Sequence, residues 1–164
     1  MERHFTSTVF VVNLLKKAIL LHWHEKVGAW LPPGGHIEKN EDPVQTAKRE
    51  VLEETGLKIK ILEKKDKNIF KEIVQVEPPH TILLEKIDDP KSGLHEHIDM
   101  IYFGINIENS DIPQNWQWVT KKQLEQSLPL LKYDGSKLPP PEDVKILGLE
   151  AINYVLKNHK NNVK

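Results

Sequence analysis

The feature that most constrains this chain is the run GHIEKNEDPVQTAKREVLEETGL, from Gly35 to Leu57. Asp42 followed by Pro43 is typical of a helix start, because an aspartate side chain accepts hydrogen bonds from the first free N–H groups and proline fits the first helical position. Gly56 suits the left-handed conformation in which helices commonly end. The run therefore predicts a helix over residues 43–55.

Two faces of this predicted helix differ in chemistry. The apolar stripe, which should pack on a sheet, consists of Val44, Ala47 and Val51. Glu50, Glu53 and Glu54 have the spacing i, i+3, i+4 and therefore share another face. Three neighbouring carboxylates repel one another, and Mg²⁺, which prefers oxygen ligands, would offset their charge. Taken alone, the same spacing also fits a solvated acidic surface.

Arginine is scarce in this chain, which has only Arg3 and Arg49 among its 23 basic residues. A planar guanidinium can hold a carboxylate through two parallel hydrogen bonds, and lysine cannot. We therefore expect Arg49 to orient a glutamate of this run rather than to bind substrate. Glu41 is expected to be a similar supporting carboxylate, or a ligand of an additional metal ion.

The segment before the helix, WLPPGGH, combines two prolines with two glycines. The prolines stiffen the approach, and the glycines permit backbone geometries that other residues avoid. A backbone carbonyl of this segment can therefore come close to a metal ion.

The fixed positions of the run also match a known signature. They read glycine, five residues, glutamate, seven residues, and then R-E-V-x-E-E-x-G-L. Each residue type makes up roughly 5–7% of average sequence, so seven matches arise by chance at about 10⁻⁹ to 10⁻⁸ per starting position. The run resembles the complete Nudix box, the signature of Mg²⁺-dependent hydrolases of nucleoside diphosphates linked to another group.

The resemblance implies a single domain over residues 1–164, an α/β protein with the Nudix α/β/α sandwich around a central mixed sheet. It implies that Mg²⁺, with Mn²⁺ as a substitute, is bound by Glu50, Glu53, Glu54 and the carbonyl of Gly34. Glu50, Glu53 and Arg49 are then the catalytic residues. We choose Glu50 as the base that takes a proton from the attacking water. In other members of the family the base lies outside the box, and Glu96 is the competing candidate here.

Several residues outside the run are candidates to contact a substrate. They are His22, His24, Trp30, Glu96, His97 and Asp99. His22 and His24 flank one residue of an early predicted strand and should point to one face of it. Glu96, His97 and Asp99 belong to the segment HEHID, which leads into a strong predicted strand, and Glu96 could also be an extra metal ligand. Trp30 could stack on a nucleotide base. For each candidate, core packing or an ordinary polar surface is the alternative.

Short apolar and β-branched segments predict strands on both sides of the box helix. These segments are 5–12, 17–23, 57–61, 69–76, 81–87, 98–107 and 116–119. Residues 63–67 are expected to form a solvated turn and residues 88–93 a loop. Thr120 should begin one further helix. Another should run from Glu142 or Asp143 to about residue 158. Its predicted buried stripe is Val144, Leu147, Ala151, Tyr154 and Val155.

Composition excludes several classes of protein. A net charge of −1 gives no bulk attraction to nucleic acid or to an anionic membrane. The absence of cysteine excludes disulfides, thiolate zinc sites and a cysteine nucleophile. It also argues against the isopentenyl-diphosphate isomerases, relatives of the Nudix fold that rely on a cysteine. No signal peptide or membrane span is evident. We expect a cytoplasmic monomer or homodimer that binds a small nucleotide.

The substrate is constrained only by motifs that this chain lacks. ADP-ribose hydrolases often carry a proline shortly after the box, and dinucleoside polyphosphate hydrolases a tyrosine; neither is present in KEIVQ. The SQPWPFP run of NADH hydrolases and the motif of coenzyme A hydrolases are also absent. Nucleoside or deoxynucleoside triphosphates and nucleotide sugars remain the leading predictions. The alternative is a catalytically silent Nudix domain that only binds or senses a nucleotide. The lack of a basic arm disfavours RNA decapping.

Overall fold

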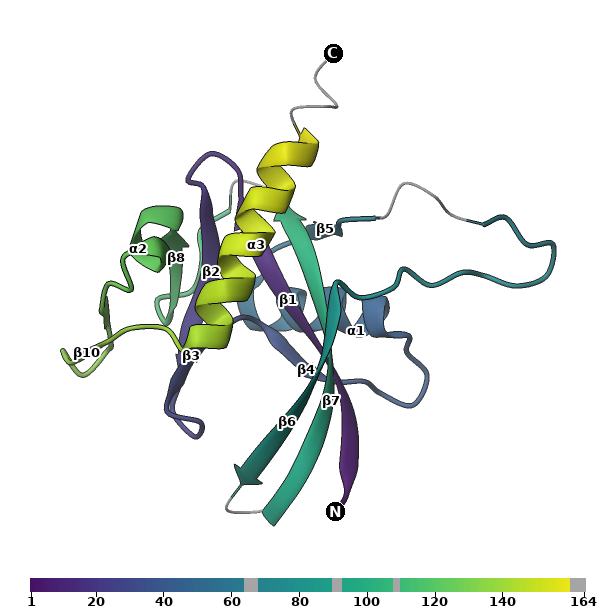
Figure 1. Ribbon diagram of the computed structural model, residues 1–164, viewed down its shortest axis with the longest axis horizontal. Helices are drawn as coiled ribbons and strands as arrows, with labels where there is room; N and C mark the ends of the chain where they lie inside the picture. The colour runs from purple at the N-terminus through teal and green to yellow at the C-terminus, as the bar shows by residue number, and fades with distance from the viewer. Residues whose placement is uncertain (64–67, 90–92, 108–109, 160–164) are drawn as a thin grey trace.

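The computed structural model describes residues 1–63, 68–89, 93–107 and 110–159, which form strands and helices around one central sheet (Figure 1). In chain order the elements are β1 (Arg3–Asn13), β2 (Ala18–His24), β3 (Ala29–Leu31), β4 (Gly34–His36), α1 (Pro43–Thr55), β5 (Ile59–Ile61), β6 (Thr81–Asp89), β7 (Gly93–Asn106), β8 (Trp116–Thr120), α2 (Lys121–Glu125), β9 (Leu130–Leu131), β10 (Lys137–Leu138) and α3 (Glu142–His159). The predicted turn at residues 63–67 lies largely outside the described residues.

The central sheet is mixed, because β1 runs parallel to β7 and antiparallel to β2 and β4. One edge of β1 is shared: β2 pairs with it near Val12 and Asn13, and β4 pairs with it from Thr6 to Thr8. The far edge of β7 is shared in the same way by β5 and β6. This sharing brings the glycines of β4 against the middle of the sheet.

Successive side chains of β1 point to opposite faces of the sheet, and this divides the core into two layers. Val9 and Val11 pack with the apolar stripe of α1. Phe10 and Val12 pack on the other face with buried residues of α3. Figure 1 shows the same arrangement, with α1 behind the sheet and α3 in front of it. The predicted α/β/α sandwich with a central mixed sheet is therefore confirmed.

The box helix begins and ends where the sequence predicts. Asp42 Oδ1 accepts hydrogen bonds from the N–H groups of Val44 at 2.8 Å and Gln45 at 2.9 Å. Gln45 Oε1 in turn accepts from the Asp42 N–H at 2.9 Å, which completes a capping box. Gly56 ends the helix with φ 71°, in the left-handed region. These caps fix the rotation of α1 and hence the direction of its glutamate face.

Three predictions for other parts of the chain are wrong. Residues 69–76 form no strand, and Ile69 and Val74 are 99% and 87% exposed. Both edges of β7 are already paired, so they offer this segment no partner. The expected loop at 88–93 is shorter, because β6 continues to Asp89 and β7 begins at Gly93; residues 90–92 lie outside the described residues. Tyr154 is 37% exposed rather than part of the buried stripe of α3.

Among the residues that the structure describes, no helix has both the length and the apolar character needed to cross a bilayer.

Candidate functional site

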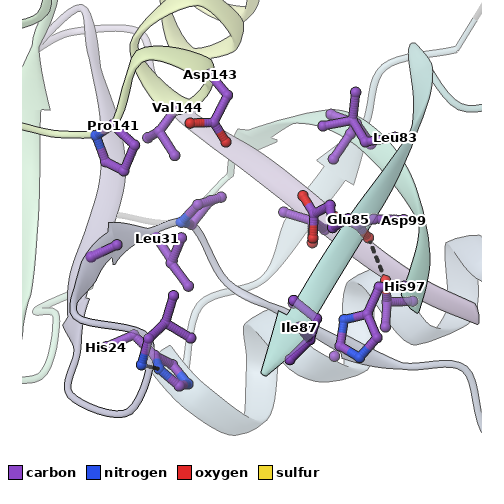
Figure 2. Close-up of a pocket in the computed structure, with 18 of the residues that line it drawn as sticks. His24, Leu31, Leu83, Glu85, Ile87, His97, Asp99, Pro141, Asp143 and Val144 are labelled. Carbon is purple, nitrogen blue, oxygen red and sulfur yellow. Dashed lines mark hydrogen bonds between the residues drawn. The ribbon is translucent and has the colours of Figure 1, made fainter. Parts of the chain in front are cut away.

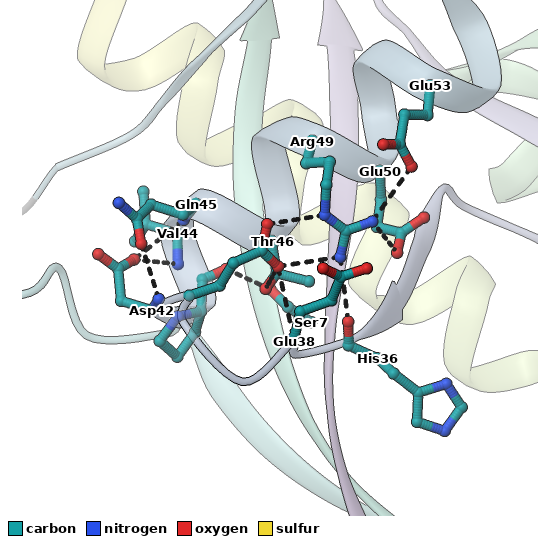
Figure 3. Close-up of polar contacts among 12 residues, drawn as sticks. Ser7, His36, Glu38, Asp42, Val44, Gln45, Thr46, Arg49, Glu50 and Glu53 are labelled. Atoms are coloured by element: carbon teal, nitrogen blue, oxygen red, sulfur yellow. Dashed lines mark hydrogen bonds and ion pairs between the residues drawn. The ribbon is translucent and has the colours of Figure 1, made fainter.

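Arg49 is the centre of a polar network on the glutamate face of α1 (Figure 3). Its Nε and Nη2 donate to the two carboxylate oxygens of Glu41 at 2.7 and 2.9 Å, in the two-pronged geometry that guanidinium favours. Its Nη1 donates to Glu50 Oε1 at 2.7 Å and to Glu53 Oε2 at 3.1 Å. Its Nη2 also donates to the carbonyl oxygen of His36 at 3.1 Å. The Arg49 side chain thus links two glutamates of α1 to the loop before the helix.

Glu41 is held in its ionised form by this network. Hydrogen bonds from Arg49 and Thr46 lower the pKa of Glu41 to about 2. The Thr46 hydroxyl donates to Glu41 Oε2 at 2.7 Å. Both oxygens of Glu41 therefore already have donors, as expected of a carboxylate that orients Arg49.

Glu54 is partly buried and lacks a full set of hydrogen-bond partners. Burial, together with the nearby charge of Glu50, raises the pKa of Glu54 to about 7. Its Oε2 is buried and has no hydrogen-bond partner among the described residues. A buried carboxylate oxygen without a donor is costly, and a cation bound to it would remove that cost. This atom therefore fits a metal ligand.

The two glycines of β4 make room for this site. A Cβ built at Gly35 would overlap the carboxylate of Glu50, with 2.6 Å to its Cδ. A Cβ at Gly34 would lie 2.6 Å from Thr8 Oγ1 and 2.8 Å from the carbonyl oxygen of Ser7. These distances are too short for real Cβ contacts. Glycine at position 34 is therefore required for the close approach of β4 to β1, and a side chain at position 35 would displace the Glu50 carboxylate.

A cleft of about 790 Å³ adjoins the glutamate face (Figure 2). Gly34, Gly35 and Glu54 contribute to its lining, so the cleft and the acidic site are continuous. The opposite wall comes from β6 and the start of α3. The volume lies within the range of about 300–1,000 Å³ that is usual for small-molecule sites.

Four of the six predicted substrate contacts line this cleft: His22, His24, His97 and Asp99. His22 stacks on Trp116 with ring centroids 4.2 Å apart. Burial, with a smaller contribution from His24, lowers the pKa of His22 to about 4. Burial likewise lowers the pKa of His97 to about 4. Both rings are therefore neutral at pH 7.

The other two predicted contacts lie elsewhere. Trp30 is 1% exposed in the core beneath α3, and its Nε1 donates to the carbonyl oxygen of Leu138 at 2.9 Å. Glu96 points to the opposite face of β7 from His97. Its Oε2 accepts a hydrogen bond from Arg3 Nε at 2.8 Å. Neither side chain contributes to the lining of the cleft.

Comparison with models of known protein families finds the NUDIX domain over residues 3–139. The chain belongs to the NUDIX family. It is similar over 94% of its length to 99% of a NUDIX-family hydrolase from Clostridium perfringens, with 26% identity and a TM-score of 0.71. Two more distant structures show the same fold. A C. elegans Ap4A hydrolase in a binary complex is 19% identical, with a TM-score of 0.60 over 94% of this chain and 98% of that one. A MutT protein from Bacillus halodurans is 20% identical, with a TM-score of 0.53 over 91% and 82%.

The chain is accordingly a Nudix hydrolase, and its Nudix box is the run that contains α1. Glu85 of β6 also lines the cleft, although it was not among the residues predicted from the sequence. Burial raises the pKa of Glu85 to about 7, and the charges of Asp99 and Asp143 add to the shift. Burial also raises the pKa of Asp99, whose Oδ1 accepts from Thr6 Oγ1 at 2.9 Å. Glu85 shares the inner face of β6 with Leu83 and Ile87.

Proposed function

We propose that this Nudix hydrolase cleaves a phosphoric anhydride bond of a nucleoside diphosphate derivative, by Mg²⁺-dependent attack of water. The observation that carries the proposal is the buried, unpartnered Glu54 Oε2 beside a cleft of nucleotide size. Nucleoside or deoxynucleoside triphosphates and nucleotide sugars are the leading substrate classes. We further propose that residues 1–164 form one domain, which acts in the cytoplasm as a monomer or homodimer.

The donor set suits Mg²⁺, because it consists of carboxylate and carbonyl oxygens. Glu50, Glu53, Glu54 and the carbonyl of Gly34 would hold the ion, and Mn²⁺ accepts the same ligands. Bound there, the cation would offset the negative charge that develops on the diphosphate oxygens. Gly35 supports the proposed role of Glu50 as a metal ligand, since a larger residue at this position would occupy the space of the Glu50 carboxylate.

Glu50 is the proposed general base. Its Oε1 is fixed by Arg49 Nη1 at 2.7 Å, which orients the carboxylate toward the acidic site. The alternative base, Glu96, is bound to Arg3 and lies outside the cleft lining. Arg49 is proposed as a positioning residue, because its donors are all directed at protein oxygens.

The remaining cleft residues support a compact nucleotide as substrate. His22 lines the cleft with Trp116, which is 4% exposed, packed behind its ring, so the His22 ring offers the kind of surface on which bases pack. His24, His97 and Asp99 offer polar groups along the same cleft. Such a site combines apolar walls with a few polar contacts, as small-molecule pockets usually do. We propose that these four cleft residues, His22, His24, His97 and Asp99, contact the substrate.

A panel assay tests this function. Release of phosphate or pyrophosphate with Mg²⁺ would be measured across nucleoside triphosphates, nucleotide sugars, ADP-ribose and dinucleoside polyphosphates. Wild-type protein should hydrolyse one class, and Glu53→Gln should lose about 100-fold or more in rate. Glu125→Gln is the matched control, because Glu125 lies on α2, away from the cleft lining, and pairs only with Lys121 at 3.6 Å among the described residues.

Two outcomes would contradict parts of the proposal. If wild-type and Glu53→Gln proteins bind nucleotide but are equally inactive on every compound, the chain is a nucleotide-binding module. If Glu50→Gln keeps most of its rate while Glu96→Gln loses it, Glu96 rather than Glu50 is the base.

A further inference from the structure

Four histidines from three strands lie together beside the cleft. His4 of β1, His36 of β4, and His95 and His97 of β7 are far apart in sequence, but strand pairing aligns them. Ring centroids are 4.9 Å apart for His4 and His95, 5.2 Å for His4 and His36, and 5.0 Å for His36 and His97. We call these four residues the histidine cluster. In Figure 3 the ring of His36 is directed away from Arg49, which binds its carbonyl.

The ring nitrogens of the cluster have nearly the spacing of ligands around one ion. His4, His36 and His97 each offer one nitrogen, and these atoms lie within 4.8 Å of one another. His36 Nε2 is 3.2 Å from His4 Nδ1, and His95 Nε2 is 3.1 Å from His97 Nε2. A tetrahedral zinc site with Zn–N of about 2.0–2.1 Å has nitrogens about 3.3–3.4 Å apart. Small side-chain movements would therefore suffice for coordination.

One member of the cluster has the outer hydrogen bond that metal-binding histidines use. His95 Nδ1 lies 2.8 Å from the carbonyl oxygen of Gly93, which can only accept, so the proton is on Nδ1 and the lone pair on Nε2. His4 Nε2 lies 3.2 Å from the carboxylate oxygen Oε1 of Glu2, and its Nδ1 faces His36 Nε2. A carbonyl or carboxylate behind the ring fixes the tautomer and raises the basicity of the ligand nitrogen.

The ligand atoms that the histidine cluster offers are ring nitrogens. Neutral imidazole is the form that binds metal. Its nitrogen prefers zinc, cobalt, nickel or copper, whereas Mg²⁺ prefers the oxygen ligands of the Nudix box. The two sites therefore differ in the class of cation that they select.

We propose that His4, His36 and His97, assisted by His95, bind one transition-metal cation of the zinc class, separately from the Mg²⁺ site of the box. The site does not depend on the proposed hydrolysis. Because His36, His95 and His97 line the cleft, the bound ion adds positive charge to a wall that faces the substrate. Through its carbonyl, His36 also connects the cluster to Arg49.

Calorimetric titration with Zn²⁺ tests the site directly. The protein would be free of affinity tags, stripped with a chelator, and titrated at pH 7.5 in saturating Mg²⁺, which occupies the box glutamates. Wild type should bind one Zn²⁺, and His97→Gln and His4→Gln should each weaken binding at least tenfold. His80→Gln is the matched control, because His80 pairs with Glu150 at 2.9 Å outside the cluster. Affinity should fall as the pH is lowered below about 6, since protonated imidazoles cannot bind metal.

Cobalt absorption and circular dichroism complete the test. Co²⁺ should give an intense tetrahedral d–d band in wild type and His80→Gln that is lost in the cluster variants, while all four proteins keep the same far-UV spectrum. His4 lies near the exposed start of β1, so His4→Gln serves if His97→Gln fails to fold. The proposal is overturned if Zn²⁺ does not bind in saturating Mg²⁺, or if the cluster variants bind it as wild type does. It is also overturned if only Glu53→Gln loses Zn²⁺, since the ion would then occupy the box.

Discussion

Replacement of Arg49 by lysine keeps the positive charge but removes the planar fork. The guanidinium makes five hydrogen bonds: two to Glu41, and one each to Glu50, Glu53 and the carbonyl of His36. An ammonium has three donors on a single atom. At least two of the five hydrogen bonds are therefore lost. A single ammonium nitrogen also cannot reach all the acceptors that surround the three nitrogens of the guanidinium. We expect Glu50 and Glu53 to lose their fixed orientation.

The expected effect falls mainly on turnover. Loss of a group that orients a metal ligand costs about 10- to 100-fold in activity or metal affinity. That range corresponds to about 1.4–2.7 kcal/mol of transition-state stabilisation. The effect on folding is smaller, because lysine keeps a positive charge beside Glu41 and Glu50, and because the pair with Glu53, which is 60% exposed, contributes only about 0–1 kcal/mol. Arg49→Lys should therefore lower kcat more than it lowers stability.

Steady-state kinetics on the best substrate and urea unfolding measure the two effects. Arg3→Lys is the matched control, since Arg3 is the other arginine of the chain, is 59% exposed and makes one hydrogen bond to Glu96. It should leave kcat within about twofold of wild type, because Arg3 lies outside the lining of the cleft and lysine keeps its charge. If Arg49→Lys also kept wild-type kcat, or if Arg3→Lys lost as much, the orienting role of Arg49 would be refuted.

Three further predictions concern the same site. Gly35→Ala should reduce turnover about 10-fold or more, because its Cβ would displace the Glu50 carboxylate; kcat with the unfolding midpoint separates this from misfolding. Mg²⁺ should raise the midpoint of thermal unfolding of wild type but not of Glu54→Gln, since only the folded chain assembles the ligands. His22 should contribute a loss of stability as the pH drops from about 6.5 to 4, because the unfolded chain then binds a proton that folded His22, with its pKa lowered to about 4, does not. His22→Phe, which keeps an aromatic ring against Trp116, should reduce that loss by about 1 kcal/mol in urea unfolding at pH 7 and pH 5, a value reduced for the partial exposure of the ring. An unchanged difference between the two pH values would contradict this assignment.

The box helix could be predicted from sequence because its determinants are local. Asp42, Pro43 and Gly56 fix its ends, and the helical period then places Glu50, Glu53 and Glu54 on one face. Arg49 was predicted to hold a box glutamate, and in the structure its fork closes on Glu41. Contacts within a few residues of one another obey the geometry of a single helix and its caps.

Features that depend on strand pairing could not be predicted. Residues 69–76 have the composition of a strand, but composition does not supply a pairing partner, and both edges of β7 are already paired. Glu96 was grouped with His97 by proximity in sequence, but adjacent residues of a strand point to opposite faces. The histidine cluster unites residues of three strands, and only the register of β1 with β4 and β7 brings them together.

The dependence of turnover on Mg²⁺ tests the central assignment most directly. Hydrolysis of the best substrate would be followed in chelator-treated protein as Mg²⁺ is added back, for wild type, Glu54→Gln and the control Glu125→Gln. We predict no turnover without added metal, saturation with Mg²⁺ in wild type and Glu125→Gln, and a maximal rate for Glu54→Gln at least about 100-fold lower, since a direct ligand is lost. Turnover that persists in chelator, or a wild-type rate in Glu54→Gln, would contradict a metal site at the glutamate face of α1.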